Sequence, residues 1–465
     1  MATPEATDPP PDEGRRSGQH GHSTRRERVG WYLYDWANSA FITTVVTVFY
    51  GPFLTAVAKQ AAGCDPASPC RSAQLQVLGL GIKPGSYFAL VVTVSVILTV
   101  FVLPALGGIA DRLARKRLLL AVCAYLGAGA TVAMVFVTGD RYLLGGGLFI
   151  VANVAYGASI VIYNSFLPQL TGPEERDAVS SVGWAVGYLG GGLLLVLNLV
   201  AVTVGEDLGI DQLDLARWNL VSAGIWWAGF TLAPLAWLKD RPPAERLPGN
   251  VVMQGFRQLR ETARHLRAYP LTLFFLLAYL IYNDGIQTVI ALASQFGSEE
   301  LKLKQGALVA TVLMVQFLAF AGALSLGALA KRIGAWKTLC LSLVLWVCVI
   351  IGAFWLPVGQ VLPFVALGGV IGLVLGGSQA LSRSLFSQMI PRGKEAEYFG
   401  LYEISDRGTS WLGSLAFVLV FELTSSYRIG IVSLLIFFVV GLALLAKAPV
   451  RRAIIAAGNT PPRVI

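Results

Sequence analysis

The chain has 465 residues, of which 55% are hydrophobic and only 14% charged, and it carries a formal net charge of +9. A soluble fold of this size has no interior large enough for that much apolar surface, so the composition predicts an integral membrane protein. Excess Lys and Arg in such a chain is typical of loops on the cytoplasmic side, so the charge does not indicate a nucleic-acid partner.

Residues 1–29 are rich in Pro, Glu, Arg, Ser and Gly and lack the apolar segment of a signal peptide, so we expect a disordered cytoplasmic tail. Beyond the tail, apolar stretches recur, each near the roughly 20 residues that a membrane-spanning helix needs. We predict twelve such helices, at 31–56, 86–110, 118–138, 143–167, 179–203, 218–238, 271–295, 305–329, 338–357, 362–386, 398–422 and 428–447. Most of the 36 Lys and Arg fall in alternate loops and in the ends of the chain, which predicts that both termini are cytoplasmic.

The longest inner loop, 239–270, divides the predicted helices into six and six. We therefore expect an all-α integral membrane protein with two pseudo-symmetric six-helix bundles, 30–238 and 271–447, and a cytoplasmic C-terminal tail at 448–465. Within the loop, Arg and apolar positions alternate from Met253 to Tyr269 as in an amphipathic helix, which lies either on the inner leaflet or in solvent as a linker.

Cysteine and histidine usage limits the chemistry. Cys64 and Cys70 share the first long loop, where a disulfide and two free thiols are both open alternatives. The three His residues, His20, His22 and His265, lie outside every predicted span. This placement excludes a His-ligated metal in the membrane, and we expect no metal site and no cofactor.

Two inner loops repeat across the halves. Residues 107–117 read GGIADRLARKR, and residues 327–337 read GALAKRIGAWK, with small residues, an aliphatic residue and cations in one register. Gly107 lets a neighbouring helix approach closely. Asp111, followed by Arg112, is placed to cap a helix or to form a pair across the halves. We expect these three residues at an inter-bundle gate, although an ordinary basic loop is the alternative.

Polar residues inside the first and fourth predicted spans are candidates for a solute path, because polar groups in a bilayer usually face a cavity or a partner. Asp35 lies about one turn inside the first span and is expected at a gate or rim, with Asn38 on nearly the same face. Asn153, Tyr156 and Asn164 of the fourth span are placed to line a pocket, with simple packing as the alternative.

The seventh predicted span contains the sequence Tyr282-Asn283-Asp284-Gly285, with Gln287 close by. Glycine beside polar residues predicts a local break in this helix. Desolvation makes the charged form of an isolated carboxyl costly, so Asp284 is a candidate for carrying a proton or for binding a substrate amine. The alternative is a structural hydrogen bond or a pair with a neighbouring helix.

The tenth predicted span carries Arg383 near its inner end, with Gln379 one turn deeper on the same face. Arginine suits bidentate binding of a carboxylate, and the alternative is that Arg383 extends to the membrane surface. A zwitterionic amino acid needs one anion and one cation within reach. Asp284 with Arg383 or Arg407 would supply both.

The eleventh predicted span begins with Glu403, Asp406 and Arg407 on one helix face, in an order that favours an internal ion pair between the first and the last. We expect these residues at a cytoplasmic gate, with Asp111 or Asp35 as partners across the halves. A shallow ion pair among lipid headgroups is the alternative.

These motifs resemble known families. The loop at 107–117, its repeat and the twelve predicted helices resemble the major facilitator superfamily. The strings WYLYDWANSAF at 31–41, GSQALSRSLF at 377–386 and EYFGLY at 397–402 resemble the autophagy-related vacuole-effluxer-like family. The resemblance implies a solute path lined by helices one, four, seven and ten, alternating access, and efflux of amino acids.

We therefore expect a secondary transporter for a small polar solute, an amino acid first, in the plasma membrane. No phosphate-binding Gly-x4-Gly-Lys-Ser/Thr motif is present, so protons are the expected driver. The expected partners are the solute, protons and the lipid bilayer, and the expected state is a monomer. A sugar or drug transporter, a non-transporting membrane sensor and a lipid-modifying enzyme are the alternatives.

Overall fold

The computed structural model describes residues 23–65, 70, 73–77, 79–241, 269–407, 411–424 and 426–465. The expected tail up to residue 22 and the predicted amphipathic helix in the central loop lie outside the described residues. So does the side chain of Arg407. The tail was predicted too long, because Thr24 caps a helix that starts at Arg25, with the Glu27 side chain bonded back to the Thr24 backbone.

The N-terminal half begins with one long span that changes its winding. It consists of α1 (Arg25–Ala40), a π-helical segment η2 (Phe41–Phe49) and α2 (Tyr50–Ala61). A short antiparallel hairpin, β1 (Leu75–Val77) and β2 (Leu80–Ile82), follows. The remaining elements are α3 (Pro84–Arg112), α4 (Lys116–Ala133), η3 (Met134–Phe136), α5 (Tyr142–Ser165), α6 (Leu167–Leu170), α7 (Arg176–Asp207) and α8 (Gln212–Trp237).

The C-terminal half has the same plan. Its elements are α10 (Pro270–Gln295), η4 (Phe296–Glu300), α11 (Gln305–Ile333), α12 (Ala335–Phe354), α13 (Val361–Gln388), α14 (Glu395–Arg407), α15 (Trp411–Thr424), α16 (Tyr427–Ser433), α17 (Leu435–Lys447) and α18 (Val450–Ala456). Among the described residues, 11 helices are long and apolar enough to cross a membrane. The eleventh predicted span, 398–422, corresponds to α14 and α15, with residues 408–410 outside the described ranges.

The predicted break at Gly285 is wrong. Helix α10 runs through this residue without interruption. A Cβ at position 285 would lie 3.0 Å from the Phe437 side chain and 3.2 Å from Phe438, so the glycine provides room for α17.

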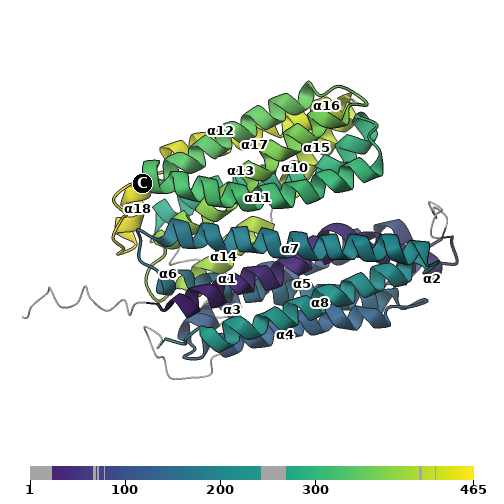
Figure 1. Ribbon diagram of the computed structural model, residues 1–465, viewed down its shortest axis with the longest axis horizontal. Helices are drawn as coiled ribbons and strands as arrows, with labels where there is room; N and C mark the ends of the chain where they lie inside the picture. Colours follow the sequence, from purple (N-terminus) through teal and green to yellow (C-terminus); the bar gives the residue numbers. More distant parts are fainter. Residues whose placement is uncertain are drawn as a thin grey trace, which may run out of the picture.

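The helices form two bundles. In Figure 1, α1–α8 lie below, and α10–α13 and α15–α17 lie above, while α14 lies at the level of the lower bundle, where it packs on α3 and α5. Helices α7 and α11 lie side by side between the bundles. The bundles converge at the end that holds α6, α14 and α18, and they diverge toward α2 and α16. Both described chain ends meet at the convergent end, because Ser23 donates to the Leu170 carbonyl and the Arg463 N–H donates to Glu174. We call this end the terminal face.

The repeated loops make equivalent close contacts between the bundles. A Cβ on Gly107 of α3 would lie 2.3 Å from the carbonyl oxygen of Ala396 in α14. A Cβ on Gly327 of α11 would lie 2.4 Å from the Ser181 hydroxyl of α7. Each glycine therefore lets a helix of one bundle touch a helix of the other, as the repeat predicts.

The first long loop is cross-linked. Cys64 and Cys70 form a disulfide beyond the end of α2, which decides between the two alternatives left open by the sequence. The other three cysteines, Cys123, Cys340 and Cys348, are free.

Candidate functional site

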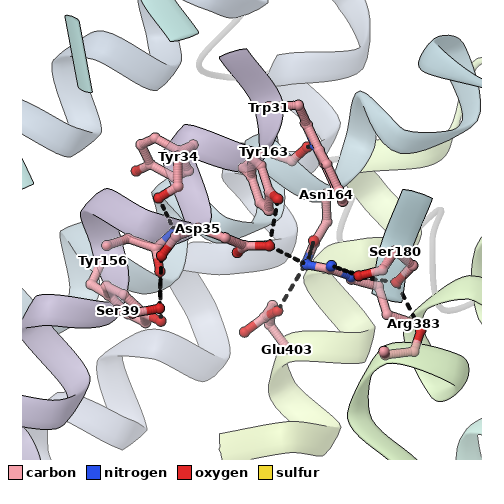
Figure 2. Close-up of polar contacts among 12 residues, drawn as sticks. Trp31, Tyr34, Asp35, Ser39, Tyr156, Tyr163, Asn164, Ser180, Arg383 and Glu403 are labelled. Carbon is pink, nitrogen blue, oxygen red and sulfur yellow. Dashed lines mark hydrogen bonds and ion pairs between the residues drawn. The ribbon is translucent and has the colours of Figure 1, made fainter. Parts of the chain in front are cut away.

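Arg383 of α13 lies between the bundles and takes its partners from the opposite one (Figure 2). Its Nη1 is 3.2 Å from Oδ2 of Asp35 in α1. Its Nε donates to the Ser180 hydroxyl of α7 at 3.0 Å, and its Nη2 donates to the Ser180 carbonyl at 2.9 Å. The Arg383 residue is only 2% exposed, so the alternative in which it reaches the membrane surface is wrong.

Aromatic rings surround the same guanidinium. Its carbon lies 4.8 Å from the ring centroid of Trp31, 5.2 Å from that of Trp184 and 5.8 Å from that of Tyr163. Such contacts with a cation are worth about 2 kcal/mol or more where water is excluded. Nothing in the sequence marks Trp184 or Ser180, because on a long apolar helix neither residue differs from ordinary packing.

Asp35 accepts a second hydrogen bond, and its side chain occupies space that a glycine of α7 leaves free. The Tyr163 hydroxyl donates to Asp35 Oδ2 at 2.7 Å, and Asp35 is buried. A Cβ on Gly183 of α7 would lie 2.7 Å from Asp35 Oδ2 and 3.0 Å from Arg383 Nη2. The absence of a side chain at position 183 therefore makes room for the ion pair.

Asn164 extends this cluster to the eleventh span. It accepts a 3.4 Å hydrogen bond from Arg383 Nη1 and donates through Nδ2 to Glu403 Oε1 at 3.2 Å. Glu403 lies on α14, so α1, α5, α7, α13 and α14 all meet here (Figure 2). The predicted pair between Glu403 and Arg407 falls outside the described side chains.

Asp111 forms a second inter-bundle contact at the terminal face. Its carboxylate accepts from the backbone N–H groups of Ala396, at 3.0 Å, and Glu397, at 2.9 Å, and it pairs with Lys116 at 2.8 Å. Asp111 therefore caps the first turn of α14 from the other bundle, where the helix dipole favours negative charge. Arg112 follows, half-buried, at the end of α3.

A separate polar network lies within the C-terminal bundle. Tyr279 and Asn283 of α10 both donate to Asp406 Oδ1 at 2.8 Å. Gln379 of α13 donates to the Asn283 side-chain oxygen at 2.9 Å. The hydroxyls of Tyr282 and Ser382, 2.6 Å apart, join the same two helices one turn away.

Asp284 faces a different helix. Its Oδ2 accepts from the Gly413 N–H of α15 at 2.5 Å, and the residue is 1% exposed. Asp284 and Arg383 thus have different partners in the described part of the chain, and the binding of one zwitterion by both remains a prediction. Gln287 is half-buried one turn from Asp284.

The remaining predicted path residues of the N-terminal bundle form hydrogen bonds within that bundle. Asn153 donates to Ser95 at 3.0 Å, and the Tyr156 hydroxyl donates to Asn38 at 3.5 Å. Asn38 donates to the Tyr34 carbonyl at 2.7 Å. Within the described ranges, no group of three or more His, Cys, Asp or Glu is placed to hold a metal ion.

The chain matches the family model described as "Vacuole effluxer Atg22 like" over residues 23–458. It belongs to this family. It is 27% identical to an uncharacterized MFS-type transporter, YxiO, of Bacillus subtilis (strain 168), over 91% of this chain and 95% of the relative. It is 26% identical to autophagy-related protein 22-1 of Penicillium rubens, over 84% of each chain.

Solved structures share the fold. The proton:xylose symporter XylE bound to 6-bromo-6-deoxy-D-glucose aligns with a TM-score of 0.67 at 12% identity, over 91% of this chain and 95% of that chain. A bacterial homologue of the iron transporter ferroportin in an outward-facing state aligns with a TM-score of 0.65 at 13% identity, over 91% and 98%. The protein is thus a multi-pass transporter of the major facilitator type with the twelve-helix fold, and not an enzyme.

Proposed function

We propose that this transporter carries amino acids by alternating access and that Arg383 recognises the substrate carboxylate. One observation supports this most: a buried guanidinium in one bundle is paired with a carboxylate, Asp35, of the other. A substrate carboxylate offers the same two oxygens as Asp35. It can therefore replace Asp35 as the partner of Arg383, so that the buried guanidinium stays paired with a carboxylate.

This exchange would link binding to opening. The terminal face is closed by the Asp35–Arg383 ion pair, by the bond from Asn164 to Glu403 and by Asp111 on the start of α14. When a substrate carboxylate occupies Arg383, the first of these contacts is lost. The bundles then separate more readily at the terminal face, and the solute is released there.

We assign the substrate ammonium to Asp406 rather than to Asp284. Asp406 projects from α14 and is held by Tyr279 and Asn283. Asp406 lies three residues after Glu403 on α14, and Asn164 hydrogen-bonds to both Glu403 and Arg383, so the proposed anion and cation lie on neighbouring helices. A zwitterion could bridge them.

Polar side chains of both bundles would complete the proposed wall around the solute. In the C-terminal bundle these are Asn283, Gln379 and Tyr282, and in the N-terminal bundle they are Asn38, Asn153, Tyr156 and Asn164. We also propose that Asp35, Gly107, Asp111, Arg112, Glu403 and Arg407 act at the gate.

The basic loops support an orientation with the terminal face and both termini in the cytoplasm. In that orientation the structure represents an outward-facing state. We propose a monomer in the plasma membrane, with protons as the coupling ion.

The test is transport by purified protein in liposomes, with alanine, ethylamine, propionate and glucose as probes. Ethylamine lacks the carboxylate of alanine, and propionate lacks its amine. We expect alanine uptake in the wild type, and its loss in Arg383→Lys, which keeps the charge but not the planar fork. Arg141→Lys, at an exposed position, is the control and should transport normally. Glucose uptake that is unaffected by Arg383→Lys would replace the amino-acid assignment with a sugar transporter.

A further inference from the structure

A cavity of about 580 Å³ opens at the terminal face, apart from the polar networks described above. Its walls come from the start of α12, from the segment that joins α17 to α18, and from the last residues of the chain. In Figure 1, α18 lies at the left end of the upper bundle, beside the mark of the C-terminus. The lining includes four cationic side chains and two large apolar ones, namely Lys337, Arg451, Arg452, Arg463, Trp336 and Ile455.

The cavity is basic. Its four cationic side chains are exposed, and no acidic residue lines the cavity in the described part of the chain. Like charges in one concave site repel one another unless an anion compensates them, and apolar walls concentrate their field. The cavity therefore fits a ligand that carries negative charge.

The walls of the cavity are held in place by hydrogen bonds to backbone carbonyls. Asn459, which follows α18, donates to the Gln388 carbonyl at 2.9 Å and to the Ile390 carbonyl at 2.7 Å. On the opposite wall, the Trp336 indole N–H donates to the Leu445 carbonyl at 2.8 Å. The cations of α18 and of α12 thus stand on supports that are fixed relative to the bundle.

The cavity lies at the boundary of the membrane. The candidate span of α12 begins at Ala335, so Lys337 lies in its first turn. The last candidate span ends at Lys447, so Arg451 lies one turn beyond it. Phospholipid headgroups occupy this depth, and tryptophan, here Trp336, is enriched there.

An exposed apolar stripe leads from the cavity along α12. Leu341 and Val344 follow Lys337 by four and seven residues, so the three side chains lie on one face of the helix. Both apolar side chains are exposed, and Ile351 continues the same face. Within the cavity, Ile455 of α18 is also exposed. A soluble anion would leave this surface uncovered, whereas an acyl chain would cover it.

We propose that this cavity binds the headgroup of an anionic phospholipid. The phosphate accepts hydrogen bonds from the guanidinium groups of α18 and the C-terminal segment and from the Lys337 ammonium. One acyl chain lies along the exposed face of α12. Arginine forks match phosphate oxygens, and basic pockets at the ends of membrane helices are suited to anionic headgroups. Binding of the lipid requires no transported solute, so it does not depend on the substrate assigned above.

The test is native mass spectrometry of the full-length protein in detergent, with three probes. Phosphatidylglycerol is anionic, phosphatidylcholine has the same phosphate but no net charge, and glycerophosphoglycerol is the anionic headgroup without acyl chains. We expect phosphatidylglycerol to bind more tightly than either of the others. The double variant Arg451→Gln/Arg452→Gln should bind it at least about tenfold more weakly. Lys337→Gln, on the other wall, should change the affinity in the same direction.

Arg25→Gln/Arg26→Gln is the matched control, because it removes two adjacent exposed cations of α1 at the same face. This control should bind phosphatidylglycerol as the wild type does. Equal binding of phosphatidylglycerol and phosphatidylcholine, or an equal loss in both double variants, would overturn the proposal. Displacement of phosphatidylglycerol by an equal concentration of glycerophosphoglycerol would also overturn it, because the occupant would then be a soluble phosphate ester.

Discussion

Arg383 and Asp35 form a buried ion pair across the two bundles, with 3.2 Å between Nη1 and Oδ2. A buried pair contributes little net stability, yet removal of one partner costs about 3–5 kcal/mol because the other charge is left uncompensated. Such a pair is better suited to a reversible contact than to a permanent one. Any carboxylate that replaces Asp35 at Arg383 still compensates the positive charge of the guanidinium.

Tyr163→Phe should weaken the closed terminal face without removing a charge. The change deletes the hydroxyl that donates to Asp35, a bond of the charged type worth about 1.5–3 kcal/mol. The ring that stacks on Trp31 at 4.5 Å is kept. We expect a lower melting temperature for the purified protein, whereas Tyr125→Phe on an exposed face of α4 should leave it unchanged. Equal melting temperatures for wild type and Tyr163→Phe would argue against the hydroxyl's role.

Gly107→Ala should impair transport, although it adds only one methyl group. The new Cβ would lie 2.3 Å from a backbone carbonyl of α14, which cannot move aside as a flexible side chain can. The two helices must separate, so the terminal face closes poorly and the initial rate of alanine uptake falls. Gly129→Ala is the matched control, because nothing lies within 4 Å of its Cβ. Normal transport by both variants would contradict the close α3–α14 contact.

Asp111→Asn should destabilise the closed state by about 1–2 kcal/mol. It removes the charge that compensates Lys116 and interacts with the positive end of α14. The free energy is measured from denaturant-induced unfolding in detergent. Asp214→Asn is the control, since its half-exposed ion pair with Arg217, three residues along the same helix, should contribute at most about 1 kcal/mol. A larger loss of unfolding free energy in Asp214→Asn than in Asp111→Asn would contradict the capping role of Asp111.

Glu395 should make closure of the terminal face depend on pH. Burial and the nearby Asp111 raise the pKa of this glutamate above its ordinary value of 4.5. The closed state therefore binds the proton more tightly than the open one. Its stability should be greatest at low pH and decline as pH rises through the raised pKa. Melting temperatures between pH 4 and 8 should show this slope in the wild type and in the exposed control Glu206→Gln, but not in Glu395→Gln. A slope that survives in Glu395→Gln would assign the effect to another group.

The fold could be predicted from the sequence because membrane spans depend on length and hydropathy, which are local properties. The contact of Gly107 and Asp111 with the opposite bundle also follows from the motif, since glycine spacing and a capping acid carry a physical meaning of their own. The contact between Asp284 of α10 and Gly413 of α15 could not be predicted in this way, because the two residues lie on different helices.

The partners of the charged residues were harder to foresee. The sequence pointed to Asp35, Asp284 and Arg383 as candidates, but it did not predict the ion pair between Arg383 and Asp35. Which acid meets an arginine depends on helix rotation and on gaps such as the one at Gly183, and neither is encoded in spacing along one helix. Gly183 itself was the available signal, because a small residue at that register makes room for the pair.

The central claim is most directly tested by measuring the distance across the terminal face. Spin labels at exposed Arg115, in the α3–α4 turn, and exposed Arg392, before α14, would be compared by electron–electron resonance in nanodiscs. The account predicts one short distance for the wild type, and a second, longer population when Asp35→Asn breaks the pair or when alanine is added. Distance distributions that stay identical in all three samples would contradict it.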